Sequence, residues 1–206
     1  VLIYVSSENA PDGKVYVKIK EGSADYVIRE LPANTSYVVE VARFENSWYF
    51  AAGAGADQKT YVYRNPVTAV KNLPQKRPVP VGILRLDEAP EQIIFSSNAR
   101  FIATQHGSQF SVYDAETDRQ YRYDTKIKLS PGQKAYWMDG HRLTLVAEEK
   151  VIVFDYDGIN LQHLSAAYNG TQPLFDRDYE AMFSLSPSTT ISGRSALTRT
   201  ELIVKP

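Results

Sequence analysis

The chain has 206 residues, of which 23 are Lys or Arg and 24 are Asp or Glu, so its formal net charge is -1. This balance gives no electrostatic reason to expect a nucleic-acid partner, because phosphate binding needs an excess of basic side chains on one face. Hydrophobic residues make up 43% of the chain, which is unlike the composition of a disordered segment. Cysteine is absent, which excludes disulfides, cysteine-ligated metals and cysteine nucleophiles.

The sequence contains no segment with the pattern of a membrane-spanning helix or of a signal peptide. No apolar run approaches the ~18 residues that a membrane-spanning helix needs. The first residue is Val1, and no basic region precedes an apolar stretch as it does in a signal peptide. We therefore interpret the chain as a piece of a longer protein, which meets a membrane only through an anchor outside this sequence.

Short runs rich in Val, Ile, Tyr and Phe recur from one end of the chain to the other. The expected strands include 1–5, 15–19, 37–44, 48–50, 61–63, 101–104, 110–113, 143–146 and 151–156. Dipeptides such as Asp12-Gly13, Asp157-Gly158 and Asn169-Gly170 separate them and accept the positive φ of tight hairpin turns. No window of eleven or more residues has helical periodicity, so we predict an all-β fold with under about a tenth helix.

The sequence contains an internal repeat. Segments 95–114 and 137–155 each open on an aromatic residue, pass through a polar turn that ends in arginine, and close with an apolar strand followed by aspartate. Arg100 and Arg142 are 42 residues apart, and Asp114 and Asp155 are 41 apart. A period of about 40 to 45 residues with four strands per unit is typical of β-propeller blades.

Extending this repeat along the chain predicts a β-propeller of four-stranded antiparallel blades. Five blade-like units would span 1–31, 37–86, 89–125, 133–167 and 172–204, with three strands in the first and last and four in the others. Residues 1–206 would form a single propeller or part of a larger one. We interpret the proline-rich stretch 71–80 as a loop insertion within the second blade, because proline cannot donate to a strand ladder. We also expect strand 197–204 either to pair with strand 1–5 or to leave an open edge that another segment or chain covers.

The repeated segments carry a family resemblance. The sequence SSNARFIATQHGSQFSVYDAET at 96–117 resembles the second and third strands of a WD40-like or YVTN-like propeller blade, and DGHRLTLVAEEKVIVFDYDG at 139–158 resembles it again. The chain as a whole is similar to extracytoplasmic propellers that follow a membrane anchor and a PEGA module in bacterial surface proteins. This resemblance implies a scaffold or binding role outside the cytoplasm, with no catalytic residues to transfer.

Histidines and an aspartate-rich turn are the first candidates for site chemistry. His106, His141 and His163 are not at the spacing of a metal motif or near a nucleophile elbow, so we interpret them as turn or surface residues. Segment 155–160 resembles the start of a calcium loop, but apolar residues occupy its fifth and twelfth positions, where ligands are required. We interpret this segment as a hairpin turn whose aspartates accept backbone N–H bonds.

Charged side chains give two further candidates. Six basic residues could form a patch for an acidic polymer, but we prefer to interpret them as solvated loop charges: Lys71, Lys76, Arg77, Lys126, Lys128 and Lys134. Asp176 and Asp178 would share one face of an extended segment, for which a solvated face is the commoner reason. A glycosidase pair of carboxylates assembled from distant blades would leave no local motif and stays open.

These observations lead us to expect a non-catalytic propeller scaffold or binding module that presents its surface to a protein or glycan partner, at a bacterial cell surface or elsewhere outside the cytoplasm. We predict no catalytic, cofactor-binding or metal-binding residue, and no cofactor. One alternative is a glycan-acting propeller hydrolase or lyase. Another is a structural subunit whose ring is completed by another chain. Carboxylates or histidines that converge at the propeller channel, instead of being dispersed around its rim, would favour the hydrolase.

Overall fold

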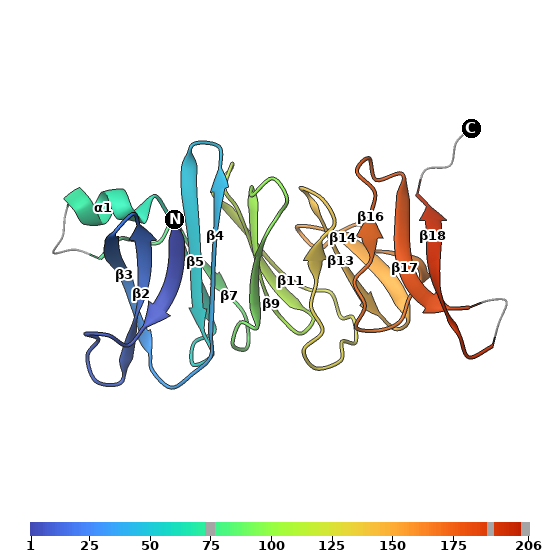
Figure 1. Cartoon of the computed structure of the whole chain (residues 1–206), viewed down its shortest axis with the longest axis horizontal. Coiled ribbons are helices and arrows are strands. Elements are labelled where there is room, and N and C mark those ends of the chain that lie inside the picture. The colour runs from blue at the N-terminus through green and yellow to red at the C-terminus, as the bar shows by residue number, and fades with distance from the viewer. Residues whose placement is uncertain (73–76, 189–191, 203–206) are drawn as a thin grey trace.

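The computed structural model describes residues 1–72, 77–188 and 192–202, which form five antiparallel sheets and one short helix. The sheets follow one another in chain order across the long axis of the molecule, so β1 and β18 lie far apart (Figure 1). This arrangement confirms the predicted all-β propeller of blade-like units, with three strands in the first and last. We number the sheets as blades 1 to 5.

The elements of each blade run in sequence order. Blade 1 has β1 (Leu2–Ser6), β2 (Lys14–Glu21) and β3 (Ala24–Pro32); blade 2 has β4 (Tyr37–Phe44), β5 (Ser47–Ala54), β6 (Lys59–Arg64) and β7 (Gly82–Arg85). Blade 3 has β8 (Gln92–Phe95), β9 (Phe101–His106), β10 (Gln109–Asp114) and β11 (Arg119–Asp124); blade 4 has β12 (Tyr136–Trp137), β13 (Arg142–Ala147), β14 (Lys150–Asp155) and β15 (Gln162–Ala166). Blade 5 has β16 (Leu174–Phe175), β17 (Ala181–Pro187) and β18 (Ser195–Glu201), and helix α1 (Pro66–Asn72) lies between β6 and β7 in the chain.

The first strand of each blade lies on the inner side of the array. β1 contacts β4, β4 contacts β8, and β8 contacts β12, so the inner strands of successive blades are neighbours. The internal repeat seen in the sequence corresponds to the second and third strands of blades 3 and 4, because β10 and β14 occupy equivalent positions 41 residues apart (150 − 109 = 41).

The hydrophobic core lies between the blades, because consecutive residues of a strand point to opposite faces of its sheet. In β14, Ile152 and Phe154 pack with Phe110 of blade 3, whereas Val151 and Val153 pack with Met182 of blade 5. All six residues are at least nine-tenths buried. A run that is apolar on both faces therefore reflects a strand enclosed between two neighbouring blades.

Helix α1 lies beside the outer strand of blade 1 (Figure 1). It begins at Pro66, whose fixed φ suits the first position of a helix. At its end Lys71 forms an ion pair with Glu21 at 2.5 Å. Further along the proline-rich stretch, Arg77 pairs with Glu30 on β3 at 2.9 Å. The predicted loop 71–80 thus starts inside α1, and residues 73–76 lie outside the described residues.

Blades 1 and 5 do not share strands in the described part of the chain. β1 pairs with β2, and β18 pairs with β17, so the alternative in which the two terminal strands pair is wrong for these residues. On β17 and β18, Leu185 and Leu197 stand opposite one another and are 41% and 73% exposed. The other expectation, that a further segment or chain covers the open blade, stays a prediction.

Candidate active site

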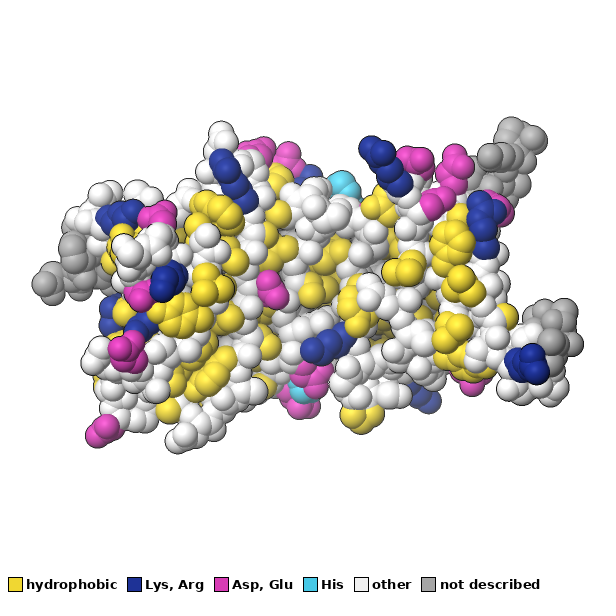
Figure 2. All heavy atoms as spheres, in the orientation of Figure 1, with side chains coloured by type: hydrophobic (Ala, Val, Ile, Leu, Met, Phe, Trp, Pro, Cys, Tyr) yellow, Lys and Arg dark blue, Asp and Glu magenta, His cyan; other side chains and the backbone are white. Residues whose placement is uncertain are grey.

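A groove of about 530 Å³ runs along the inner strands of blades 2, 3 and 4. Its polar lining comes from three blades: Tyr37 and Glu40 of β4, Glu91 and Gln92 at the start of β8, and Lys134 and Tyr136 at the start of β12. Its apolar lining consists of Val38, Val39, Ile93 and Ile94. On the face drawn in Figure 2, charged side chains gather mostly along the upper and lower rims, and hydrophobic and uncharged groups fill most of the middle.

Glu40 is the only charged residue in the stretch 38–42 of β4, whose other four residues are apolar. Its neighbours Val39 and Val41 pack into the core between blades 1 and 2. The alternation of the strand therefore directs Glu40 to the opposite face, toward blade 3, together with Val38. Glu40 is exposed, and no described residue forms a hydrogen bond or ion pair with its carboxylate.

Glu91 is held in place at the other wall of the groove. Its backbone N–H donates to the Gln105 carbonyl at 2.9 Å, and the Gly107 N–H donates to its Oε2 at 3.3 Å. The His106 Nδ1 lies 3.8 Å from Glu91 Oε1 and 2.7 Å from the Ala89 carbonyl oxygen. Backbone and imidazole groups thus fix the Glu91 carboxylate at the start of β8.

Lys134 projects from a backbone segment that two buried glutamines hold. Gln92 and Gln105 are 8% and 1% exposed and hydrogen-bond to each other at 2.6 Å. Gln105 Oε1 accepts from the Ala135 N–H at 2.9 Å, and Gln92 Nε2 donates to the Ala135 carbonyl at 2.9 Å. Gln105 Nε2 also donates to the Gln133 carbonyl at 3.4 Å, so the residues on both sides of Lys134 are anchored.

The groove therefore brings carboxylates from adjacent blades into one space. Carboxyl groups can donate or accept a proton at a reacting oxygen, and they can also hydrogen-bond to hydroxyl groups. Tyr37 and Tyr136 add aromatic surface, and the Tyr37 hydroxyl is oriented by donating to the Pro32 carbonyl at 2.7 Å. This combination suits a hydroxyl-rich substrate with an acid-labile bond.

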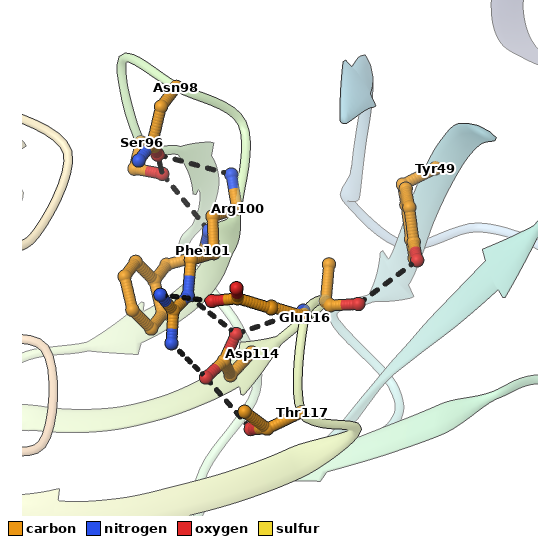
Figure 3. A network of polar contacts seen from close by, with 9 residues as sticks. Tyr49, Ser96, Asn98, Arg100, Phe101, Asp114, Glu116 and Thr117 are labelled. Atoms are coloured by element: carbon orange, nitrogen blue, oxygen red, sulfur yellow. Dashed lines mark hydrogen bonds and ion pairs between the residues drawn. The ribbon is translucent and has the colours of Figure 1, made fainter. Parts of the chain in front are cut away.

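A second polar cluster, where β9 begins and β10 ends, stabilises blade 3 (Figure 3). Asp114 is 1% exposed and accepts two hydrogen bonds from Arg100 at 2.8 Å each. It also accepts from the Glu116 N–H at 3.0 Å and the Thr117 hydroxyl at 2.8 Å. Burial raises the pKa of the Asp114 carboxyl, but these hydrogen bonds outweigh burial and hold its pKa below the usual value. All its acceptor sites are occupied, so we assign it a structural role.

The residues singled out from the sequence are distributed over several blades. His106 ends β9 beside Glu91, His141 stacks edge-on against Phe101 at 5.6 Å, and His163 lies opposite Ile152 on β15. Over residues 1–72, 77–188 and 192–202, no group of three or more His, Cys, Asp or Glu side chains could hold a metal ion.

The calcium-like segment 155–160 is a turn, as predicted. The Gly158 N–H donates to the Asp155 carbonyl at 2.9 Å, the Ile159 N–H donates to Asp157 Oδ1 at 3.3 Å, and Asn160 Nδ2 donates to Asp155 Oδ2 at 2.5 Å. Asp176 and Asp178 lie in the turn between β16 and β17, where Asp176 accepts the Glu180 N–H at 2.8 Å.

The basic residues of this set that the structure describes are spread over blades 1 to 4. Lys71 and Arg77 form ion pairs at the edge of blade 1, Lys126 pairs with Asp124 in blade 3 at 2.7 Å, and Lys134 lines the groove. Lys76 lies outside the described residues. Sequence reasoning missed Glu40 and Glu91; a lone charge in the run VVEVA and an acid in DEAPE were their only signals.

Comparisons with known proteins identify similar folds. No protein-family model and no curated protein matches the sequence. The solved periplasmic gluconolactonase PpgL of Pseudomonas aeruginosa matches with a TM-score of 0.49 and 15% identity, over 97% of this chain and 66% of that one. A candidate 6-phosphogluconolactonase from Bacteroides uniformis matches with a TM-score of 0.48 and 10% identity, over 97% and 67%. The structure of a nidogen/laminin complex matches with a TM-score of 0.46 and 13% identity, over 95% and 76%.

These comparisons correct the functional expectation drawn from the sequence. Two of the matched structures are named as lactonases, which are hydrolases, and this finding overturns the preference for a non-catalytic scaffold or binding module. The chain spans 66% of the length of the Pseudomonas protein. At these identities the similarity shows a common fold only, so the case for an activity has to come from the groove itself. No helix among the described residues is long and apolar enough to cross a membrane.

Proposed function

We propose that this propeller is a hydrolase that acts on a carbohydrate substrate, with the groove along β4, β8 and β12 as its active site. The observation that carries the proposal is that Glu40 and Glu91, from adjacent blades, line the same groove. Convergence at the inner strands was the feature expected of a propeller hydrolase, in contrast to carboxylates dispersed around the rim. The scissile bond would be the C–O bond of a glycoside or of a sugar lactone.

The two carboxylates differ in surroundings, and the difference assigns their roles. The Glu91 carboxylate accepts a backbone N–H bond and lies beside an imidazole nitrogen, so it is held in one orientation at the wall of the groove. It is therefore the general base that removes a proton from the attacking water. Glu40 has no such donor among the described residues and lies beside Val38, so it supplies the proton to the departing oxygen.

The remaining lining groups orient the substrate. Tyr37 and Tyr136 offer ring faces and edges to the apolar side of a sugar, and Lys134 donates hydrogen bonds from a fixed backbone position. The resemblance of the sequence to extracytoplasmic bacterial propellers supports a location outside the cytoplasm. The glycan that binds in the groove is then both the substrate and the binding partner of this protein.

Turnover measurements on single variants test the proposal. Wild-type protein, Glu40→Gln and Glu91→Gln are incubated with a panel of oligosaccharides and with glucono-δ-lactone, and product is followed by proton NMR. We expect hydrolysis by the wild type and a loss of about a hundredfold or more in kcat for each variant, with little change in KM. Glu148→Gln, an exposed residue of the β13–β14 turn, is the matched control and should retain full activity. Hydrolysis that survives both groove substitutions would exclude this site.

A further inference from the structure

A second cavity, of about 420 Å³, lies between blades 4 and 5. It shares no lining residue with the groove along the inner strands. Four polar side chains face it, from β13, β15 and the β16–β17 turn: Arg142, Gln162, Asp178 and Tyr179. Met138, Leu164, Val153 and Leu202 form its apolar wall.

Arg142 lies one residue further along its repeat than Arg100 does and makes different contacts. Arg142 stands opposite Asp155 on β14, the place that Phe101 has opposite Asp114 on β10, and successive residues of a strand point to opposite faces. In blade 3, Arg100 is bidentate to Asp114 and also pairs with Glu116, so its guanidinium is fully used in closing its own blade. In blade 4 the equivalent aspartate, Asp155, accepts instead from Asn160. Because of this one-residue shift, Arg142 is released from the contact with the last aspartate of its own blade that Arg100 keeps.

Asp139 sets the orientation of the released arginine. Its Oδ2 accepts from Arg142 Nε at 2.7 Å and from Nη2 at 2.6 Å, and its Oδ1 accepts the His141 and Arg142 N–H groups at 2.7 Å each. The Asp139 side chain is 14% exposed and the Arg142 side chain 43%. Arg142 Nη1 has no partner among the described residues, so a fixed donor is left facing the cavity.

The charges around the cavity limit the class of ligand. The charge of Arg142 is balanced by Asp139, and the unpaired Asp178 carboxylate lies on the same wall, so an anion would meet net repulsion. A cation would lie beside the Arg142 guanidinium. Fixed donors, an amide and a carboxylate above an apolar wall instead fit a neutral ring that carries hydroxyl groups on its edge and C–H groups on its face.

We propose that the cavity between blades 4 and 5 is a saccharide-binding site that takes a neutral sugar unit. Arg142 and Asp178 hydrogen-bond to its hydroxyl groups, Gln162 completes the polar rim, and Tyr179 with Met138 and Leu164 packs against its ring. The site is independent of the proposed hydrolytic groove, because no residue is common to both. Its occupancy does not require that the groove be active.

The test is a binding measurement on the full chain with neutral sugars as probes. Glucose, galactose, N-acetylglucosamine and their β-1,4-linked disaccharides are titrated while the Arg142 Nε–H signal is followed by NMR; the signal is assigned by its loss in Arg142→Gln. We expect at least one sugar to shift this signal. Arg142→Gln and Asp178→Asn should each weaken binding of that sugar by about fivefold or more, as the loss of one hydrogen bond does.

Controls separate this site from the groove and from effects on folding. Asp178→Asn keeps the shape of an exposed side chain that forms no hydrogen bond or ion pair with a described residue, so it should unfold like the wild type while binding more weakly. Arg177→Gln, an exposed neighbour that does not line the cavity, and the Glu40→Gln Glu91→Gln double variant should bind the sugar normally. The proposal is overturned if no sugar in the panel shifts the Arg142 signal, or if Arg142→Gln and Asp178→Asn bind as the wild type does.

Discussion

We expect Asp114→Ala to destabilise the propeller strongly. We expect the same change at Asp155, the equivalent position of the repeat, to have a much smaller effect. The Asp114 carboxylate is 1% exposed and accepts four hydrogen bonds, two of them from Arg100. Breaking a buried ion pair by removing one partner costs about 3–5 kcal/mol. Arg100 keeps its pair with Glu116 and is 22% exposed, so we expect the low end, about 3 kcal/mol. For a chain of this size, that lowers the melting temperature by roughly 6–12 °C.

Asp155→Ala is the matched control, because Asp155 accepts a side-chain bond only from the exposed Asn160. We expect a cost below about 1 kcal/mol, measured by urea unfolding with linear extrapolation. The pKa of Asp114 is lowered in the folded protein, so its contribution is complete above the unfolded value of about 3.9 and is lost as pH falls through the folded value. The difference between wild type and Asp114→Ala should therefore shrink in acid. Equal costs at the two positions, or a gap that widens in acid, would refute the reasoning.

Three further changes have expected outcomes. Gly158→Ala should cost about 3 kcal/mol, because Gly158 has a φ of +85° and an added Cβ would lie 2.5 Å from the Tyr123 ring; a urea midpoint equal to that of the wild type would contradict this. Hydrogen bonding to the Lys126 ammonium lowers the pKa of Asp124 to about 2, so Lys126→Met should raise it toward 3.9 in a carboxyl NMR titration, and an unchanged value would show that Lys126 is not the cause. Arg77→Ala removes a half-exposed ion pair and should shift stability by less than about 1 kcal/mol by the same urea assay; a larger loss would show that this segment is part of the core.

The propeller architecture was predictable because its signal is repeated. Strand composition recurs in every blade, and Arg100 and Asp114 recur as Arg142 and Asp155 at nearly constant offsets. Helix α1 was missed because it has only seven residues, which is shorter than the window in which helical periodicity can be recognised. Its position beside β3 follows from tertiary contacts that local propensity does not encode.

The candidate site was hidden for a different reason. Glu40 and Glu91 are 51 residues apart (91 − 40 = 51) and belong to different blades, so only the contact between β4 and β8 brings them into one groove. The different contacts of Arg100 and Arg142 could not be predicted from the sequence either. It depends on Asp139, in the turn before β13, which replaces Asp155 as the partner of the arginine.

The central claim is that the groove hydrolyses a carbohydrate with Glu40 and Glu91 as its acid and base. The most direct test compares kcat of the wild type with that of the Glu40→Gln Glu91→Gln double variant on the sugar or lactone that the wild type turns over fastest, using proteins purified side by side. The account predicts that kcat of the double variant is far below that of the wild type but at most about tenfold below that of the less active single variant. The two losses do not add, because the two residues act as a unit. Undiminished turnover by the double variant, or no turnover of any carbohydrate by the wild type, would contradict it.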